Sequence, residues 1–329
     1  MAFRLKLVPE YTTIDFFKAQ KITFGISTLL AILSVVVLFM NGLNFGIDFR
    51  GGTTIRTESA QPVDVAAYRA ALSGMDLGDV AITEVFDPGF RADQNVAQVR
   101  IGAQDGVEAV SPDTIRAVEA ALQTVDPSIS FPSVESVGPK VSGELIQTAI
   151  YAVLASLIAI SIYIWLRFEW QFAVGAIISL IHDVLITMGV FALFQIRFDL
   201  ATVAALLTIV GYSINDTVVV FDRLRENLIK YKKRALRDLM NLSVNETLSR
   251  TVMTSGTTLL ALIALLVLGG DVIRGFVFAI TFGILIGTYS SIYVAKNVVL
   301  WLGVKRNWDK TDPEAKKKTA SPFEGAEEV

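Results

Sequence analysis

Long uninterrupted runs of apolar residues constrain this chain more than any other feature of its sequence. A helix of about twenty apolar residues spans the roughly 30 Å hydrocarbon core of a bilayer. Because that core holds no water to satisfy backbone polar groups, each run has to be helical. We predict six membrane-spanning helices, at residues 22–41, 146–166, 172–194, 199–221, 252–270 and 275–302.

The overall composition agrees with a membrane protein. Of the 329 residues, 53% are hydrophobic, more than a soluble domain of this length contains. The chain has no cysteine and one histidine, which excludes a disulfide framework, a thiolate metal site and a histidine-rich metal site. The first apolar run is too long for the apolar part of a signal peptide and no A-x-A site follows it, so we expect a retained helix.

Lysine and arginine predict the orientation of the spans. They are concentrated in an N-terminal segment (1–21), in a basic loop (222–250) and in a tail (303–329) that we expect to be disordered. With six spans, all three segments fall on one side of the membrane. Both termini are therefore predicted to be cytoplasmic, and residues 42–145 to lie outside.

The outer segment has the pattern of a small mixed domain. Strand-like alternation at 53–59, 79–87, 95–103 and 129–138 is interrupted by two helical patterns, at 62–75 and 111–126. The order β-α-β-β-α-β is that of ferredoxin-like folds. The predicted fold class is thus an all-α six-helix transmembrane bundle with a small external α+β ferredoxin-like domain. This domain serves either for docking or for direct contact with a moving substrate.

Ionisable residues inside the predicted spans are the candidate functional groups, because a charge in hydrocarbon is costly. Asp216 lies near the cytoplasmic end of one span, and Arg250 enters the next span from the same side. Either Asp216 is a hydrated carboxylate at the interface, or it exchanges a proton in a polar cavity with Arg250 as its partner. We expect Asn215, Tyr212 and Thr254 to provide polar support.

Asp183 and His182 lie in the middle of the span 172–194. Residues four apart share a helix face, so Gly175, Ser179, Asp183 and Thr187 form one small and polar stripe. Asp183 either belongs to a proton relay with His182 or is a buried carboxylate bonded to Ser and Thr hydroxyls. His182 is otherwise a packed, hydrogen-bonded ring.

Two further patterns concern packing and coupling. In the last span, small residues at every fourth position predict a close-packing seam without chemistry: Gly275, Ala279, Gly283, Gly287, Ser291 and Ala295. After the first span, NFGIDFRGGTTI (44–55) is either a turn that leads into the first strand or a hinge between the membrane and the external domain. The hinge residues are Asp48, Arg50, Gly51 and Gly52.

Five segments of the chain resemble the SecD/SecF family of protein-export membrane proteins, in the resistance–nodulation–division superfamily. They are GIDFRGGT (46–53), LRFEWQFAVGAIISLIHDV (166–184), VGYSINDTVVVFDRLREN (210–227), SRTVMTSGTTLL (249–260) and GTYSSIYVA (287–295). The resemblance implies a multi-pass subunit of the bacterial inner membrane that promotes protein export with the proton-motive force. In this family Asp216 and Arg250 match the positions of the membrane carboxylate and arginine, and His182 to Val184 match an HDV triplet.

The same resemblance implies the partners of the chain. They are a SecD-like subunit, the SecYEG translocation channel, YajC, the unfolded polypeptide in transit and membrane lipid, but no nucleic acid. Protons are the coupling ion, and we expect no other cofactor, no metal and no catalytic residue, so the chain is not expected to be an enzyme. One alternative is a half-transporter that exports small molecules or lipids. The other is a subunit that stabilises a translocase without proton coupling.

Overall fold

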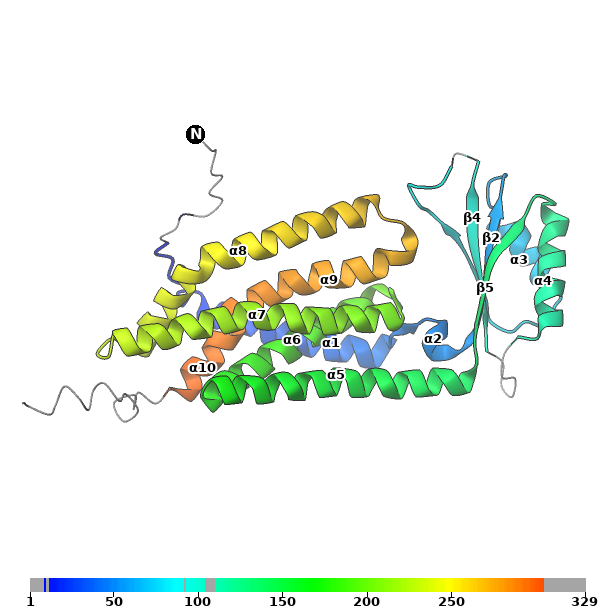
Figure 1. The fold of residues 1–329 in the computed structure, drawn as a ribbon. Helices are drawn as coiled ribbons and strands as arrows, with labels where there is room; N and C mark the ends of the chain where they lie inside the picture. The colour runs from blue at the N-terminus through cyan, green and yellow to red at the C-terminus, as the bar shows by residue number, and fades with distance from the viewer. Residues whose placement is uncertain (1–8, 10–11, 92, 104–109, 305–329) are drawn as a thin grey trace, which may run out of the picture.

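The fold was obtained as a computed structural model, which describes residue 9 and residues 12–91, 93–103 and 110–304. In that part of the chain six helices are long and apolar enough to cross a membrane, which confirms the six predicted spans. They form one elongated bundle, with a separate sheet domain beyond one end (Figure 1). The helices are α1 (Gln20–Asn41), α5 (Pro139–Arg167), α6 (Trp170–Phe194), α7 (Leu200–Lys230), α8 (Leu236–Leu268) and α9 (Asp271–Ser290), and α9 continues through a π-helical turn, Ser291–Ala295, into α10 (Lys296–Leu302).

The predicted basic loop 222–250 is mostly helical, so that assignment was wrong. Helix α7 continues to Lys230 and α8 begins at Leu236, which leaves residues 231–235 as the connection. The extensions hold each other: Arg223 Nε lies 2.7 Å from Glu246 Oε2, and Asn227 Nδ2 donates to Ser243 Oγ at 3.0 Å. Hydropathy predicts only where a helix leaves the lipid. The polar contacts between the extensions stabilise both helices beyond that point, where they are surrounded by water.

Two helices, α6 and α7, form the centre of the bundle. Half of the apolar window of each is buried, compared with 6% for α1 and α5 and 11% for α8. Glycines bring helices close together: a Cβ on Gly189 of α6 would lie 2.3 Å from Ser34 Oγ of α1, and a Cβ on Gly283 of α9 would lie 2.3 Å from Ile209 of α7. The predicted small-residue seam therefore packs α9 against α7.

The sheet domain follows the element order that the sequence pattern predicts. It contains β2 (Gly52–Ser59), α3 (Val65–Leu72), β3 (Val80–Val85), β4 (Asn95–Gly102), α4 (Pro112–Val125) and β5 (Ser130–Val137). The strands form an antiparallel sheet in the order β3-β4-β2-β5. Side chains cap both helices, since Asp64 accepts hydrogen bonds from two N–H groups of α3 and Ser111 accepts one from Thr114 of α4.

Helices α3 and α4 cover the sheet face that points away from the bundle (Figure 1). Their apolar side chains form one core with the strands, with Ile55, Val99, Val118 and Leu122 fully buried. The opposite face of the sheet is directed towards the end of the bundle. The sheet domain therefore has its own core and is not part of the membrane core.

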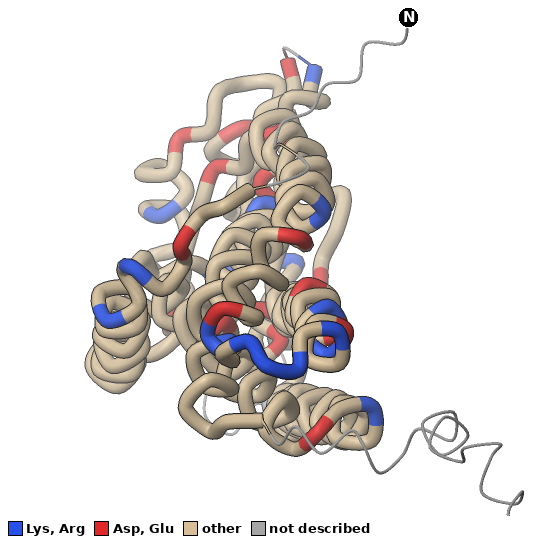
Figure 2. The backbone as a smooth tube through the Cα atoms, turned by 90° about the vertical axis from the view of Figure 1, so that its left-hand side faces the viewer, with Lys and Arg blue, Asp and Glu red and all other residues tan. Residues whose placement is uncertain are grey.

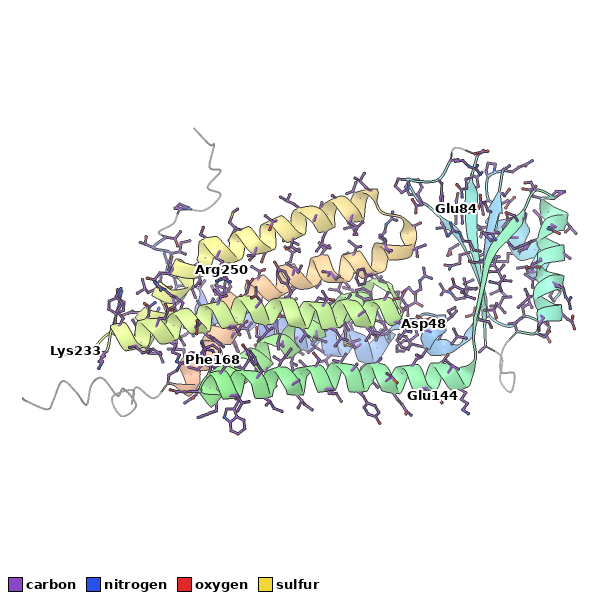
Figure 3. The ribbon with its side chains drawn as sticks, in the orientation of Figure 1. Asp48, Glu84, Glu144, Phe168, Lys233 and Arg250 are labelled. Atoms are coloured by element: carbon purple, nitrogen blue, oxygen red, sulfur yellow. The ribbon has the colours of Figure 1, made fainter. Side chains whose placement is uncertain are left out.

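The end of the bundle opposite the sheet domain is rich in basic residues. Figure 2 views this end, with Lys and Arg in blue. It carries the α7–α8 connection with Lys232, Lys233 and Arg234, and Figure 3 labels Lys233 there. The predicted tail 303–329 lies outside the described residues from position 305 onwards.

The sheet domain gives a first prediction, at Asp126. This carboxylate follows α4, and the hydroxyl of Ser59 on β2 donates a hydrogen bond to it, as do the N–H and hydroxyl of Ser128. These bonds hold the pKa of Asp126 below its usual value. A depressed pKa adds stability above the unfolded-state value, near 4, that is lost as the pH falls through the folded-state value. We expect Asp126→Asn to reduce hydrogen-exchange protection of β2 and β5 at pH 7.

The exposed pair Asp113 and Arg116 on α4 provides the control, since Asp113 pairs within its own helix and Asp113→Asn removes the same charge there. The loss caused by Asp126→Asn should shrink as the pH is lowered below the usual aspartate range. A loss that persists unchanged at low pH would show that the carboxylate charge has no part in it.

Candidate functional site

Asp183 lies in the middle of α6 and is only 1% exposed. Its Oδ2 accepts hydrogen bonds from Ser213 Oγ of α7 at 2.7 Å and from Ser290 Oγ of α9 at 2.8 Å. Its Oδ1 lies 3.0 Å from His182 Nδ1. The side chain thus joins three helices, as a buried carboxylate needs several donors to offset its loss of water.

The predicted polar stripe of α6 faces these neighbouring helices. Ser179 donates to Ser290 at 2.9 Å, and a Cβ on Gly175 would lie 2.9 Å from the carbonyl oxygen of Ala295 in the π-helical turn. Thr187 instead donates to the carbonyl of Asp183 in its own helix. His182 is buried, and its Nε2 has no hydrogen-bond partner among the described residues.

Asp216 is buried in α7, with 3% of its surface exposed. Ser255 Oγ of α8 donates to its Oδ2 at 3.3 Å, and the same hydroxyl lies 2.8 Å from Thr288 Oγ1 of α9. The positive charge of Arg250 acts on Asp216, but the two side chains form no ion pair within 4 Å. The structure therefore places Arg250 near the carboxylate without a direct contact.

Helix α9 connects the two carboxylates. Thr288 belongs to the Asp216 cluster and Ser290 to the Asp183 cluster, two residues apart on the same helix. On α7, Ser213 lies three residues before Asp216 and therefore close to it on the helix surface. The sequence pattern predicted Ser and Thr hydroxyls around Asp183 as one alternative, but it did not identify these residues. Ser213, Ser255, Thr288 and Ser290 do occur in the segments that carry the family resemblance, which was the available signal.

The three residues expected to support Asp216 lie elsewhere. Tyr212 Oη is 3.3 Å from Thr258 Oγ1 and links α7 to α8. Thr254 donates to the carbonyl of Arg250 in its own helix. Asn215 is exposed on the surface of α7. Sequence spacing identified the correct helices, but the rotation of α8 presents Ser255 rather than Thr254 to the carboxylate.

Polar side chains also lie on the outer surface of α7 and α8. Asn215 and Thr208 are exposed on α7, and Arg250 and Thr257 on α8, although both helices are membrane-spanning by length and composition. Figure 3 labels Arg250 on α8, away from the sheet domain. Polar side chains in membrane helices normally face protein or a water-filled cavity, so this surface is unsuited to lipid.

The predicted hinge residues lie at the junction between the bundle and the sheet domain. Strand β1 (Asn44–Phe45) pairs in parallel with β6 (Arg197–Phe198), and the short helix α2 (Ile47–Arg50) follows. Asp48 Oδ2 accepts a hydrogen bond from the N–H of Leu200, the first residue of α7. Figure 3 labels Asp48 at this junction. The connection is therefore attached to the α6–α7 turn.

The two glycines that end this junction have positive φ angles, 74° at Gly51 and 129° at Gly52. A Cβ on Gly52 would lie 2.3 Å from the carbonyl oxygen of Ile101, so no side chain fits there. Arg50 is exposed nearby. Burial lowers the pKa of Arg100 on β4, and the charges of Arg197 and Arg50 lower it further. Cationic groups from the bundle and the sheet thus lie close together here.

A second contact joins the sheet domain to the bundle. Asp271, the first residue of α9, accepts a hydrogen bond from the N–H of Phe86 at 2.7 Å, and its own N–H donates to the carbonyl of Phe86 at 3.0 Å. Gly270 fits against Asp87, since a Cβ there would lie 2.0 Å from Asp87 Oδ2. The segment after β3 is thereby attached to the helix that carries Thr288 and Ser290.

Six apolar helices, hydrogen-bonded carboxylates between them and one separate sheet domain define a multi-pass membrane protein. Residues 117–305 match the family described as protein export membrane protein SecD/SecF, C-terminal, and residues 36–63 match the SecD/SecF GG motif. The chain belongs to the SecF family of protein translocase subunits and is an auxiliary subunit of Sec protein export. Among the described residues, no three His, Asp or Glu side chains come together as a metal site would require.

Several relatives support this assignment over nearly their whole length. The protein translocase subunit SecF of Cereibacter sphaeroides is 73% identical over 315 residues, which covers 96% of this chain and 97% of the relative. The subunit of Rhodobacter capsulatus is 62% identical over 322 residues, with the same two coverages. The subunit of Rickettsia rickettsii is 38% identical over 309 residues, covering 94% of this chain and 97% of the relative.

Solved structures show the same fold within a longer chain. The crystal structure of SecDF, a translocon-associated membrane protein from Thermus thermophilus, has a TM-score of 0.78 and 37% identity. The match covers 90% of this chain but only 39% of the SecDF chain. A structure of SecDF in a super-membrane-facing form has a TM-score of 0.66 at 37% identity, covering 96% of this chain and 41% of that one.

The Asp183 cluster gives a second prediction. We expect Ser213→Ala combined with Ser290→Ala to destabilise the bundle, because Asp183 Oδ2 then loses both of its donors inside the protein. Leaving a buried polar group unsatisfied costs about 1–3 kcal/mol. Thermal unfolding of the full chain in detergent measures the effect. Ser161→Ala is the control, because that hydroxyl donates to the carbonyl of Leu157 in its own helix and, among the described residues, to no neighbouring helix. Equal stability of the double variant and the control would contradict the assigned role of Asp183.

Proposed function

We propose that this chain couples proton movement to protein export, with Asp216 as the group that binds and releases the proton. The observation that carries the proposal is a buried carboxylate in a membrane helix with one neutral hydroxyl donor and a cationic side chain near it. Such a group is costly when charged and unpaired, and either protonation or a closer approach of Arg250 removes that cost. Two states of similar free energy are what proton coupling requires.

The hydrogen bonds around Asp216 suggest how a proton would alter the packing. A charged Asp216 accepts from Ser255 and attracts Arg250, which holds α8 against α7. A neutral carboxyl group loses that attraction and gains a proton to donate. Because Ser255 also lies 2.8 Å from Thr288, the change would reach α9 directly. Moving one charge through 100 mV is worth ~2.3 kcal/mol, comparable to one or two such hydrogen bonds.

Asp183 and His182 are the other two residues expected in a proton relay, and the proposal gives them a supporting role. Asp183 has more donors than Asp216 and is almost fully enclosed, so it is the better-satisfied carboxylate. It shares α7 and α9 with the Asp216 cluster. In the proposal, Asp216 exchanges the proton and Asp183 fixes the three helices whose positions respond.

The movement of α7 and α9 would be transmitted to the sheet domain through two attachments, one at the start of each helix. One is the pair of hydrogen bonds between Asp271 and Phe86 at the start of α9. The other is the junction that begins at Asp48 and ends at Gly51 and Gly52, the proposed hinge. The strand order β3-β4-β2-β5 supports a ferredoxin-like sheet domain, which is a stable unit that moves as a whole.

We also propose a SecD-like partner that covers the polar surface of α7 and α8. Asn215 and Arg250 are exposed there, and facing lipid would be unfavourable for both. The similar SecDF chain, of which this chain spans about 39%, contains additional sequence for such a partner. The family resemblance adds four further proposed partners: SecYEG, YajC, the exported polypeptide and surrounding lipid.

The proposed location is the bacterial inner membrane, with both termini in the cytoplasm and the sheet domain in the periplasm. The basic residues at the end of the bundle opposite the sheet domain support this orientation. The relatives do not favour the half-transporter alternative. A purely structural subunit differs from the proposal in one measurable respect, since its export activity would not depend on Asp216.

The central prediction concerns Asp216→Asn, which keeps the shape and an acceptor for Ser255 but cannot ionise. We expect the variant to assemble and to export at the rate that the native chain reaches without a proton gradient. Export into inverted membrane vesicles, with and without a gradient, measures this. Asp222→Asn is the control, because Asp222 pairs with Arg167 at the bundle end. Gradient-dependent export by Asp216→Asn would refute the coupling proposal.

A further prediction tests the attachment of α9 to the sheet domain. Asp271→Ala removes the acceptor for the N–H of Phe86, and we expect faster hydrogen exchange at Phe86 and slower gradient-driven export at unchanged membrane levels. Asp113→Ala on the exposed surface of α4 is the control. Faster exchange without any loss of export would show that this contact does not transmit movement.

A further inference from the structure

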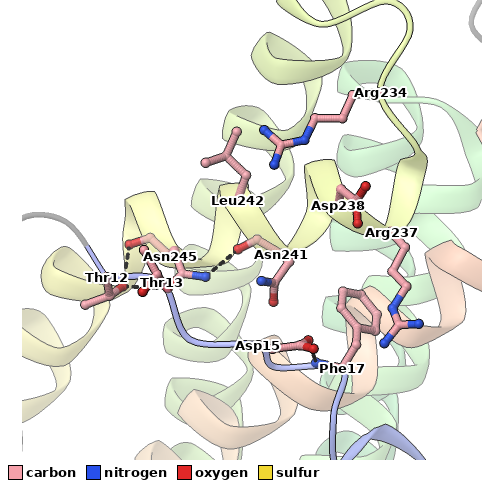
Figure 4. A pocket seen from close by; sticks show the side chains of 10 residues that line it. All are labelled: Thr12, Thr13, Asp15, Phe17, Arg234, Arg237, Asp238, Asn241, Leu242 and Asn245. Atoms are coloured by element: carbon pink, nitrogen blue, oxygen red, sulfur yellow. Dashed lines mark hydrogen bonds between the residues drawn. The ribbon is translucent and has the colours of Figure 1, made fainter.

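A cavity of about 550 Å³ lies at the basic end of the bundle, and neither Asp183 nor Asp216 lines it (Figure 4). Its volume is typical of small-molecule sites. An N-terminal strap (Thr12–Phe17) forms one wall, and the beginning of α8 together with Arg234 of the α7–α8 connection forms the other. The lining residues are Thr12, Thr13, Asp15, Phe17, Arg234, Arg237, Asp238, Asn241, Leu242 and Asn245.

Two asparagines of α8 hold the strap in place. Asn245 Oδ1 accepts from the Thr12 hydroxyl at 2.7 Å and from the N–H of Ile14 at 2.9 Å, and its Nδ2 donates to the carbonyl of Ile14 at 2.8 Å. One turn earlier, Asn241 Oδ1 accepts from the N–H of Phe16. Both asparagines thus form hydrogen bonds with the strap backbone as a neighbouring strand would. These bonds fix the position of this wall of the cavity.

The other end of the strap is fixed by Lys296. This lysine follows the π-helical turn and is only 1% exposed. Its Nζ donates to the carbonyl of Phe16 at 3.3 Å and lies 4.2 Å from the ring centre of Phe17. A cation over aromatic rings is stabilised by their negative faces. Two firmly placed elements therefore form the walls of this open cavity.

The cavity presents two guanidinium groups that form no ion pair among the described residues, although Asp15 and Asp238 also line it. Within the described part of the chain, no carboxylate oxygen lies within 4 Å of Arg234 or Arg237. Arg237 instead lies over the ring of Phe17, at 5.4 Å. The two acidic lining residues interact with nearby backbone groups. Asp15 accepts a hydrogen bond from the N–H of Phe17, and Asp238 lies in the first turn of α8, where the helix dipole stabilises a negative charge.

We propose that this cavity binds the phosphodiester group of an anionic phospholipid such as phosphatidylglycerol. Guanidinium groups match phosphate oxygens in charge and geometry. The amide of Asn241 and the carboxylates of Asp15 and Asp238 match the hydroxyls of a glycerol headgroup. Basic pockets between membrane helices are known to select such headgroups.

The position of the cavity favours a lipid over a soluble phosphate ester. The strap leads into α1, which begins at Gln20 and is apolar from its second turn onwards. The cavity therefore lies where the apolar run meets water, the level of the headgroups. Ile14 of the strap is half exposed beside it, as expected for a residue in contact with acyl chains.

The test measures binding of phosphatidylglycerol and of phosphatidylcholine to the purified full chain in detergent, by native mass spectrometry. The double variant Arg234→Gln with Arg237→Gln should bind phosphatidylglycerol roughly 30-fold more weakly, since each basic residue near an anionic surface contributes about one kcal/mol. Leu242→Trp, which fills the cavity without a change in charge, should also weaken binding. Thermal unfolding checks that both variants remain folded.

The matched control is Lys232→Gln with Lys233→Gln, which removes two charges from the same connection outside the cavity lining. Selective loss in the arginine and tryptophan variants, with the lysine control near native affinity, supports the site. Equal loss in the lysine control would assign binding to diffuse surface charge and overturn the proposal. Glycerol 3-phosphate binding as tightly as the lipid would overturn the lipid assignment in favour of a soluble phosphate ester.

Discussion

The hydrogen bonding of Asp183 is the constraint on which the bundle depends. A carboxylate that is 1% exposed inside a membrane protein has to find its donors in neighbouring helices. Ser213 and Ser290 provide them, so α6, α7 and α9 are fixed at one level. Glycines at 283 and 287 allow α9 close enough to α7 for these bonds to form. Small residues and short hydroxyl side chains therefore act together, because only a close approach brings a serine within reach of the carboxylate.

The Asp216 cluster differs from the Asp183 cluster in how many hydrogen bonds its carboxylate accepts. Asp216 has one hydroxyl donor, at 3.3 Å, and a cationic side chain that does not touch it. A better-satisfied carboxylate gives rigidity, whereas a poorly satisfied one can change state at low cost. Both clusters contact α9, through Thr288 and Ser290. The same helix begins at the attachment to the sheet domain, so that one element connects membrane and sheet.

The opposite end of the bundle is organised by different forces. There the N-terminal strap is held by the amides of Asn241 and Asn245 and by the buried ammonium group of Lys296. Helices α7 and α8 continue past the apolar runs because Arg223, Glu246 and Asn227 bond to one another. Polar contacts thus shape the part of the bundle that meets water, and they leave two arginines facing a cavity.

Much of this organisation follows from the sequence alone. Run length and apolarity determine six membrane helices, because only a helix satisfies its backbone in lipid. The alternation of apolar and polar residues and the helix-capping residues determine the order of elements in the sheet domain. The free-energy cost of a charge in hydrocarbon identifies Asp183 and Asp216 as candidate functional residues. Only the tertiary structure decided which hydroxyl meets which carboxylate. A rotation of α8 by one residue exchanges Thr254 for Ser255. The sequence determines that each apolar run is a helix, but the rotation and depth of the helix are set by the packing of all six helices together.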